Sequence, residues 1–145
     1  MITRKYTKKP FVLKAEATSL FSIVSIMLIV KRFKVVTITK FQIYLWALQN
    51  KDNIRQILNW KKDGKITNVP WMYEDITPLI IQCVLNRLLK TNTNKSGKVS
   101  LEFDINADIL LESIKDLELS KKVSEEINKI GNITDKQLKN LELDF

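Results

Sequence analysis

The chain has 145 residues, of which 45% are hydrophobic and 28% charged. This length and composition suit one globular domain that buries a sizeable core and needs no disulfide or metal to stabilise it. It has no histidine and one cysteine, Cys83, which excludes imidazole-dependent catalysis, an internal disulfide and the usual His and Cys zinc sites. The net charge of +8 is uneven: residues 1–65 carry 14 Lys and Arg against 3 Asp and Glu, and residues 66–145 carry 10 against 13. This asymmetry suits contact with a polyanion or an acidic protein surface, and equally a solvated, solubilising face.

Residues 1–14 are basic, with five cations and no acid, and Pro10 interrupts any regular element there. The composition predicts a flexible arm outside the packed domain. Cations of such an arm can neutralise nucleic-acid phosphates, or they can simply keep a tail soluble. The candidate phosphate-binding residues of the arm are Arg4, Lys5, Lys8 and Lys9.

An apolar stretch follows, and its pattern predicts a buried central helix over residues 17–33. A narrow stripe of Thr18, Ser22 and Ser25 would let another helix approach closely, each hydroxyl bonding back to its own helix. The uncharged stretch between Glu16 and Lys31 is 14 residues long, shorter than the roughly 20 that a membrane span requires. We therefore expect a cytoplasmic protein that does not contact a membrane.

Residues 35–38 form a short β-branched run, and the next helix is expected to start at Lys40 behind a capping box of Thr39 and Gln42. This helix has two apolar faces. The second face, with Ile43 and Trp46, is a candidate protein interface.

A further helix over residues 52–62 is expected to end at Gly64 in a left-handed cap. Residues 66–75 lack a helical period and predict a loop rich in large apolar side chains. Such side chains anchor protein interfaces, although the loop could also bury them in its own core. The candidate interface residues here are Pro70, Trp71, Met72 and Tyr73.

Thr77 as N-cap and Pro78 at the first position predict a helix over residues 78–90. Its expected core face is Ile80, Ile81, Val84, Leu85 and Leu88. Its expected exposed face, a candidate DNA-reading surface, is Gln82, Asn86, Arg87 and Lys90. Cys83 lies near the boundary as a small packed hydrophobe, and Arg87 would depress its pKa slightly.

A turn over residues 94–97 and an alternating strand over residues 99–105 predict a hairpin with a basic turn, in which Lys95 and Lys98 are candidate phosphate contacts. Three shorter helices follow at residues 107–117, 121–130 and 135–141. The last begins with a capping box of Thr134 and Gln137.

This order of elements predicts a mainly α fold with a small β hairpin, that is, a winged-helix-like core with an inserted helix and extra C-terminal helices. The expected organisation is a basic flexible arm at 1–14, the core at 15–105 and a C-terminal helical extension at 106–145.

Signals for chemistry are weak. Asp52 and Asp63 superficially match the spacing of a metal-dependent nuclease, but that chemistry needs the pair on a sheet edge and Asp63 is expected at a helix end. With only three glycines there is no phosphate-binding Gly-rich loop. We expect no catalytic residues, no metal, no cofactor and no enzymatic activity.

Four segments carry a likeness to a known family: TITKFQIYLWAL at 37–48, KDNIRQIL at 51–58, GKITNVPWMYEDITPLIIQCVLNRLL at 64–89 and SGKVSLEF at 96–103. In these, the chain resembles the small middle components of bacterial ABC-three-component and Lamassu-type antiphage systems, over roughly residues 17–117. The resemblance implies a winged-helix-like accessory subunit seated between an SMC-like coiled-coil ATPase and an effector, often a nuclease. It implies no catalytic residue in this subunit.

Two functions remain open. The first is a non-catalytic adapter that links an SMC-like ATPase to an effector nuclease in an antiviral defence complex, with non-specific DNA contact. The alternative is a free winged-helix transcription regulator, which should dimerise by itself and bind one DNA sequence.

Overall fold

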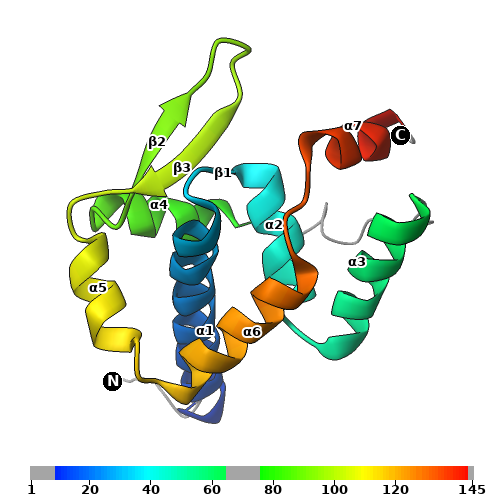
Figure 1. Cartoon of the computed structure of the whole chain (residues 1–145). Coiled ribbons are helices and arrows are strands. Elements are labelled where there is room, and N and C mark those ends of the chain that lie inside the picture. The colour runs from blue at the N-terminus through cyan, green and yellow to red at the C-terminus, as the bar shows by residue number, and fades with distance from the viewer. Residues whose placement is uncertain (1–8, 65–75, 144–145) are drawn as a thin grey trace.

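The computed structural model describes the backbone of residues 9–64 and 76–143 and the side chains of residues 20–64 and 76–139. Helices dominate, and a small antiparallel sheet projects from them (Figure 1). The elements are α1 (Lys9–Phe33), β1 (Val36–Thr37), α2 (Ile38–Ala47), α3 (Lys51–Asp63), α4 (Thr77–Leu85), β2 (Leu89–Thr93), β3 (Val99–Phe103), α5 (Ala107–Ile114), α6 (Glu118–Ile130) and α7 (Asp135–Leu143). The expected mainly α fold with a small hairpin is confirmed.

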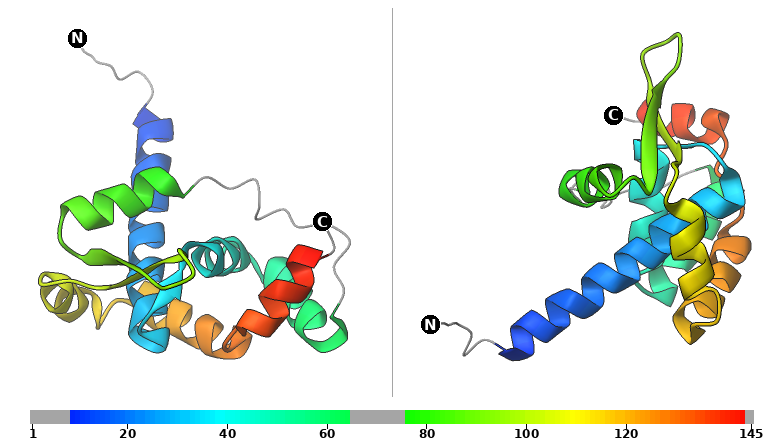
Figure 2. Two further views of the ribbon diagram at one scale, coloured as in Figure 1. Left: turned by 90° about the horizontal axis from the view of Figure 1, so that it is seen from above. Right: turned by 90° about the vertical axis from the view of Figure 1, so that its left-hand side faces the viewer.

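Helix α1 is the central element, and α2, α4, α5, α6 and the sheet pack against it, whereas α3 packs on α2 and α6 (Figures 1 and 2). Its residues from Val24 to Val30 are all buried, as the absence of a wide polar face predicts. The helix starts at Lys9, not at residue 17, so residues 9–14 are helical and do not belong to a flexible arm. Pro10 does not break the helix because it occupies the first turn, where its missing N–H would have no partner.

Ser25 lies on the buried side of α1 and is fully buried. Within the described part of the chain, its Oγ has no hydrogen-bond partner, so the expected bond back to its own helix is not formed. Ser120 of α6, a helix that packs on α1, is also buried with an unpaired Oγ. The small size of both side chains, and not their polarity, is what suits them to the core.

The sheet has the order β1-β3-β2, with both pairs antiparallel. Val36 pairs with Leu101 and Leu89 pairs with Phe103, so β1 joins the hairpin of β2 and β3, which lies far from it in the sequence. The sheet contacts α1 through β1 and β3 and contacts α4 through β2. Helix, short strand, helices and a hairpin that returns to the first strand make the core winged-helix-like, with α3 as the inserted helix.

The helix caps agree with the sequence in part. Gly64 ends α3 in the left-handed conformation (φ 73°) and donates its N–H to the Trp60 carbonyl, as expected. The N-cap of α2 is Thr37 and not Thr39: its Oγ1 accepts from Lys40 N–H at 3.4 Å. Thr37 can cap because it ends β1 with an extended backbone (ψ 159°), the conformation that an N-cap residue needs.

Helix α4 differs most from its prediction. It begins at Thr77, so the cap position belongs to Ile76, and it ends at Leu85 instead of residue 90. Arg87 has a left-handed backbone (φ 58°), and Leu88 N–H bonds to the Cys83 carbonyl across the turn. Because the chain turns at Arg87, Leu89 is the first residue of β2, where it is fully buried. Pairing of β2 with β3 thus overrides the local helical propensity of residues 86–90.

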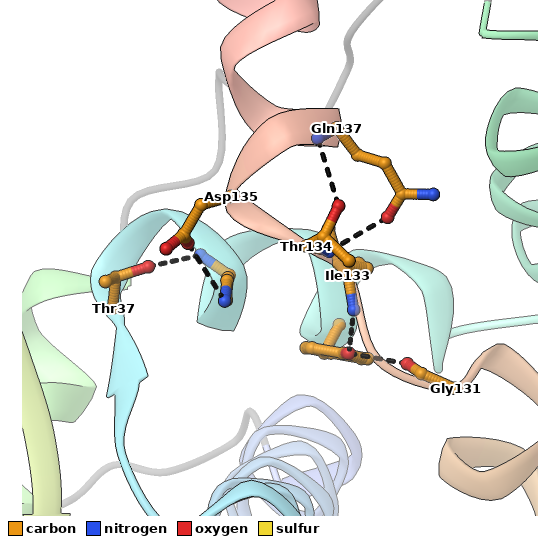
Figure 3. Close-up of polar contacts among 8 residues, drawn as sticks. Thr37, Gly131, Ile133, Thr134, Asp135 and Gln137 are labelled. Atoms are coloured by element: carbon orange, nitrogen blue, oxygen red, sulfur yellow. Dashed lines mark hydrogen bonds and ion pairs between the residues drawn. The ribbon is translucent and has the colours of Figure 1, made fainter.

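Hydrogen bonds and an ion pair connect the C-terminal helices to the core (Figure 3). The Tyr44 hydroxyl donates to the Gly131 carbonyl (2.6 Å) and accepts from Ile133 N–H (3.1 Å). Lys40 and Asp135 form an ion pair at 3.2 Å. The capping box of α7 is confirmed, because Thr134 and Gln137 each accept the other's backbone N–H.

In the described ranges, none of the helices combines the length and the apolar character that crossing a membrane would require.

Candidate protein and nucleic-acid interface

Most of the predicted site residues that the structure describes lie on α4, in the turn that ends it, or on the hairpin that follows. In a winged helix, the helix that precedes the hairpin is the one that enters the DNA major groove. In this chain that helix is α4, and the wing is the hairpin of β2, β3 and the turn between them.

Helix α4 turns Ile80 and Cys83 into the core, with exposed fractions of 7% and 1%. Another face of the helix is exposed. It is a stripe with three- and four-residue spacing that consists of Pro78, Ile81, Gln82 and Leu85. Ile81 is 51% exposed and Leu85 is 77% exposed. The predicted core face was therefore wrong at Ile81 and Leu85, because Cys83, treated as a boundary residue, is part of the buried side.

Hydrogen bonds of Asn106 hold the start of α5 against the end of α4. Its side-chain Nδ2 donates to the Asn86 carbonyl and its backbone N–H donates to the Arg87 carbonyl, both at 3.0 Å. This contact places the segment that carries Ile105 and Ile109 beside the last turn of α4. Ile105 is 73% exposed and Ile109 is 72% exposed.

Four large aliphatic side chains, each at least half exposed, thus lie on α4 and on the segment that Asn106 joins to its end. We call these four residues, Ile81, Leu85, Ile105 and Ile109, the α4–α5 corner. Single exposed aliphatic residues are ordinary, whereas a group of them is typical of a protein-binding surface. Sequence reasoning missed it, although Ile76, Ile80 and Cys83 at four- and three-residue spacing would have identified the true core side of α4.

The four residues predicted to read DNA do not form one helical face. Gln82 lies on α4, Asn86 and Arg87 lie in the turn that ends it, and Lys90 lies on β2, where it pairs with Glu102 across the strands at 3.5 Å. The Asn86 side chain donates to the Gln82 carbonyl. We correct this prediction because the helix ends five residues early.

The wing carries the other predicted phosphate contacts. Asn94 organises its turn, since its Oδ1 accepts from the Ser96 and Lys98 N–H groups at 3.0 and 2.9 Å. Residues 91–99 are all exposed, Lys95 and Lys98 among them. Residues 89–103 contain three lysines against one acidic residue, Glu102, which pairs with Lys90. The wing is therefore a projecting, positively charged hairpin.

The remaining predicted site residues do not contribute to this surface. Ile43 and Trp46 are 0% and 7% exposed, so the second apolar face of α2 is covered by the chain's own core and the prediction that it meets a partner is wrong. Lys9 is the first residue of α1. Arg4, Lys5, Lys8 and the segment Pro70, Trp71, Met72 and Tyr73 lie outside the described residues.

The buried thiol offers no reactive group at this surface. Burial raises the pKa of Cys83 to about 11, which is opposite to the small decrease expected from Arg87. Among the described residues, no three Cys, Asp or Glu side chains are grouped closely enough to hold a metal ion.

Comparisons with known protein families, with curated proteins and with solved structures found no match to this chain.

Proposed function

We propose that this chain is a non-catalytic accessory subunit that joins other macromolecules, with the α4–α5 corner as a protein-binding surface and the wing as a non-specific DNA contact. The partners that its resemblance to ABC-three-component and Lamassu-type systems implies are an SMC-like ATPase and an effector nuclease in an antiviral complex. The ATP hydrolysis and the cutting would belong to those partners.

The observation that carries the proposal is the character of the exposed stripe on α4. A helix that reads DNA offers cations and amides to the base edges. This stripe offers Ile81, Leu85, Pro78 and one amide, Gln82. Such a surface favours burial against another protein, because each aliphatic side chain that leaves water contributes about 1.5–3 kcal/mol.

The wing supports contact with DNA in a different way. Lysines on a projecting hairpin can reach phosphates from either groove, and phosphate contacts orient a protein on DNA without reading its sequence. Lys95 and Lys98 are exposed at the turn. A chain that is held by protein contacts and touches DNA only through such cations suits an adapter better than a free regulator, which needs several base-edge contacts.

The test is co-purification. We expect the gene for this chain to lie beside a gene for a coiled-coil ATPase, and the two products to co-purify when they are expressed together. Leu85→Glu with Ile109→Glu should abolish co-purification, since removing a central interface side chain costs about 2–4 kcal/mol, or roughly 30- to 1000-fold in affinity. Both positions are exposed, so melting of the isolated chain should be nearly unchanged.

The matched control is Val35→Glu with Leu117→Glu, which changes two other exposed aliphatic residues (50% and 40% exposed) away from the corner. It should co-purify as the wild type does. Retention of the partner by the corner variant would contradict the proposal. A wild-type chain that forms a dimer alone and binds one DNA sequence would favour the transcription regulator instead.

A further inference from the structure

A second recessed surface lies between α3 and α6, on helices that the α4–α5 corner does not include. It is a groove of about 520 Å³, within the size range of pockets that bind ligands. The α3 wall is formed by Lys51, Ile54, Arg55 and Leu58. The α6 wall is formed by Lys122, Glu125, Glu126 and Lys129.

The spacing of these residues shows that the groove runs along both helices. On each wall the four positions are i, i+3, i+4 and i+7, which is one continuous face of a helix over two turns. Two turns of α-helix rise about 10 Å. A groove bounded by two helical faces of this length matches the side of a third helix.

A hydrogen bond joins the two walls of the groove at one end. Lys61 of α3 donates from Nζ to the carbonyl of Ile130, the last residue of α6, at 2.6 Å. Partial burial at this contact lowers the pKa of Lys61. Because α3 and α6 are already joined, a helix that enters the groove does not have to organise its walls first.

The apolar and charged side chains of the walls indicate which kind of partner fits the groove. Leu58, which is partly exposed, and the edge of Ile54, which is buried in the core, provide an apolar floor. Four cations and two glutamates line the rims. On α6, Glu125 precedes Lys129 by four residues and Lys122 precedes Glu126 by four, so this wall can neutralise itself.

The α3 wall differs from the α6 wall, because both of the charged residues that line the groove on α3, Lys51 and Arg55, are cations. Arg55 also pairs with Asp52 at 3.2 Å, but both side chains are more than two-thirds exposed, and such pairs contribute little to stability. A ligand carboxylate can therefore replace Asp52 at small cost. The positive rim of α3 is complementary to a row of acidic side chains.

We infer that the α3–α6 groove binds an amphipathic helix of a protein partner, with the apolar stripe of that helix on Ile54 and Leu58 and an acidic flank along Lys51 and Arg55. This surface is distinct from the α4–α5 corner, so the inference does not require that the corner bind a partner. If both hold, the chain has two separate protein contacts, as a subunit between two others requires.

The experiment uses the full chain and a fluorescent synthetic peptide of about 15 residues, close to the shortest length at which helices form in water. The peptide carries Leu at i, i+3, i+4 and i+7 and Glu along one flank. Fluorescence anisotropy should show saturable binding. Replacing the peptide's Glu by Lys, or its Leu by Gln, should weaken binding by about tenfold or more, that is, by about 1.4 kcal/mol.

Variants of the chain locate the site. Lys51→Glu with Arg55→Glu reverses the α3 rim and should weaken peptide binding by about tenfold or more. The matched control is Lys62→Glu with Lys121→Glu, which makes the same charge change at exposed positions of α3 and α6 outside the groove lining. The control should bind the peptide almost as tightly as the wild type, and all three proteins should melt at similar temperatures.

Four results would overturn the inference. They are no saturable binding of the acidic peptide, equal weakening by the groove and control variants, binding of the lysine peptide as tight as that of the glutamate peptide, and tighter binding of a short duplex DNA that the groove variant alone abolishes. The last would assign the groove to nucleic acid.

Discussion

At the scale of single residues, Tyr44 shows how one polar atom in an apolar environment joins distant segments. It is 1% exposed, and its hydroxyl bonds to both Gly131 and Ile133 in the connection between α6 and α7. Burial raises the pKa of Tyr44 to about 12, and the Ile133 hydrogen bond and the charge of Arg32 offset this only in part. The folded chain therefore keeps the phenol proton, which is donated to Gly131, well into the alkaline range.

We predict that Tyr44→Phe lowers the free energy of unfolding by about 1–3 kcal/mol at pH 7, because it leaves the Ile133 N–H buried without a partner. Urea denaturation followed by circular dichroism measures this. An unchanged free energy of unfolding would mean that the two hydrogen bonds do not fasten the C-terminal helices.

The same residue predicts how stability depends on pH. Between pH 10 and 12 the unfolded chain loses the Tyr44 proton and the folded chain keeps it, so stability falls as the pH rises through this window. Tyr44→Phe should lack this component. Because Cys83, with its pKa raised to about 11, titrates in an overlapping window, the comparison is best made in a Cys83→Ala background.

At the scale of secondary-structure elements, the outer part of the wing, residues 91–99, is built locally and is exposed throughout. Asn94 and Gly97 (φ 85°) shape its turn, whereas the buried residues of the hairpin, Leu89 and Leu101, lie outside this part. A segment without buried side chains can be altered without unfolding the protein, which makes its function separable from its stability.

We predict that Lys95→Gln with Lys98→Gln weakens binding to duplex DNA of any sequence and reduces the salt dependence of binding. Removing one lysine–phosphate interaction should lower the slope of log affinity against log salt by about 0.9, so the double variant should lower it by about 1.8. Lys62→Gln with Lys121→Gln removes the same charge elsewhere and should leave the slope nearly unchanged. If both double variants alter the slope equally, the wing makes no particular contact.

At the scale of the whole molecule, one hydrophobic cluster runs from α1 to α7. It joins Val24 of α1 and Phe41 of α2 to Val123, Ile127 and Leu138 in the C-terminal helices. The boundary predicted after residue 105 therefore falls within a continuous core. Helix α6 packs on both α1 and α3 (Figure 1), so it covers part of the central helix and is not an appendage.

We predict that a chain ending at Leu117 does not fold cooperatively. It would lack five buried aliphatic side chains, Val123, Ile127, Ile130, Ile133 and Leu138. At about 1.5–3 kcal/mol each, their removal is comparable with the whole stability of a small domain, about 5–15 kcal/mol. Thermal melting followed by circular dichroism should show no sigmoidal transition.

A shortened wing is the control for this truncation. Asn92 and Ser100 are paired across the strands, so a two-residue Asn-Gly turn can join them in place of residues 93–99. All the residues removed are exposed, and cooperative melting should persist. Cooperative melting of the truncated chain would show that residues up to 117 form an independent domain.

Features that depend only on neighbouring residues were predictable from the sequence. The buried helix before residue 33, the left-handed cap at Gly64, the capping box of Thr134 with Gln137 and the alternating strand from Val99 all follow from local periodicity and turn chemistry. These features need only a few residues of context, because the backbone groups that they satisfy lie within one or two turns.

Tertiary structure decided what depends on distant segments. Strand pairing of Leu89 with Phe103 ended α4 early, which separated the predicted DNA-reading residues. Packing of Ile80 and Cys83 in the core left Ile81 and Leu85 exposed. Packing in the core buried Ile43 and Trp46, which an apolar pattern alone cannot distinguish from an interface. The α3–α6 groove joins faces more than 60 residues apart, from Leu58 to Lys122. The periodicity of a segment shows that one of its faces is apolar, but which surface covers that face depends on segments elsewhere in the chain.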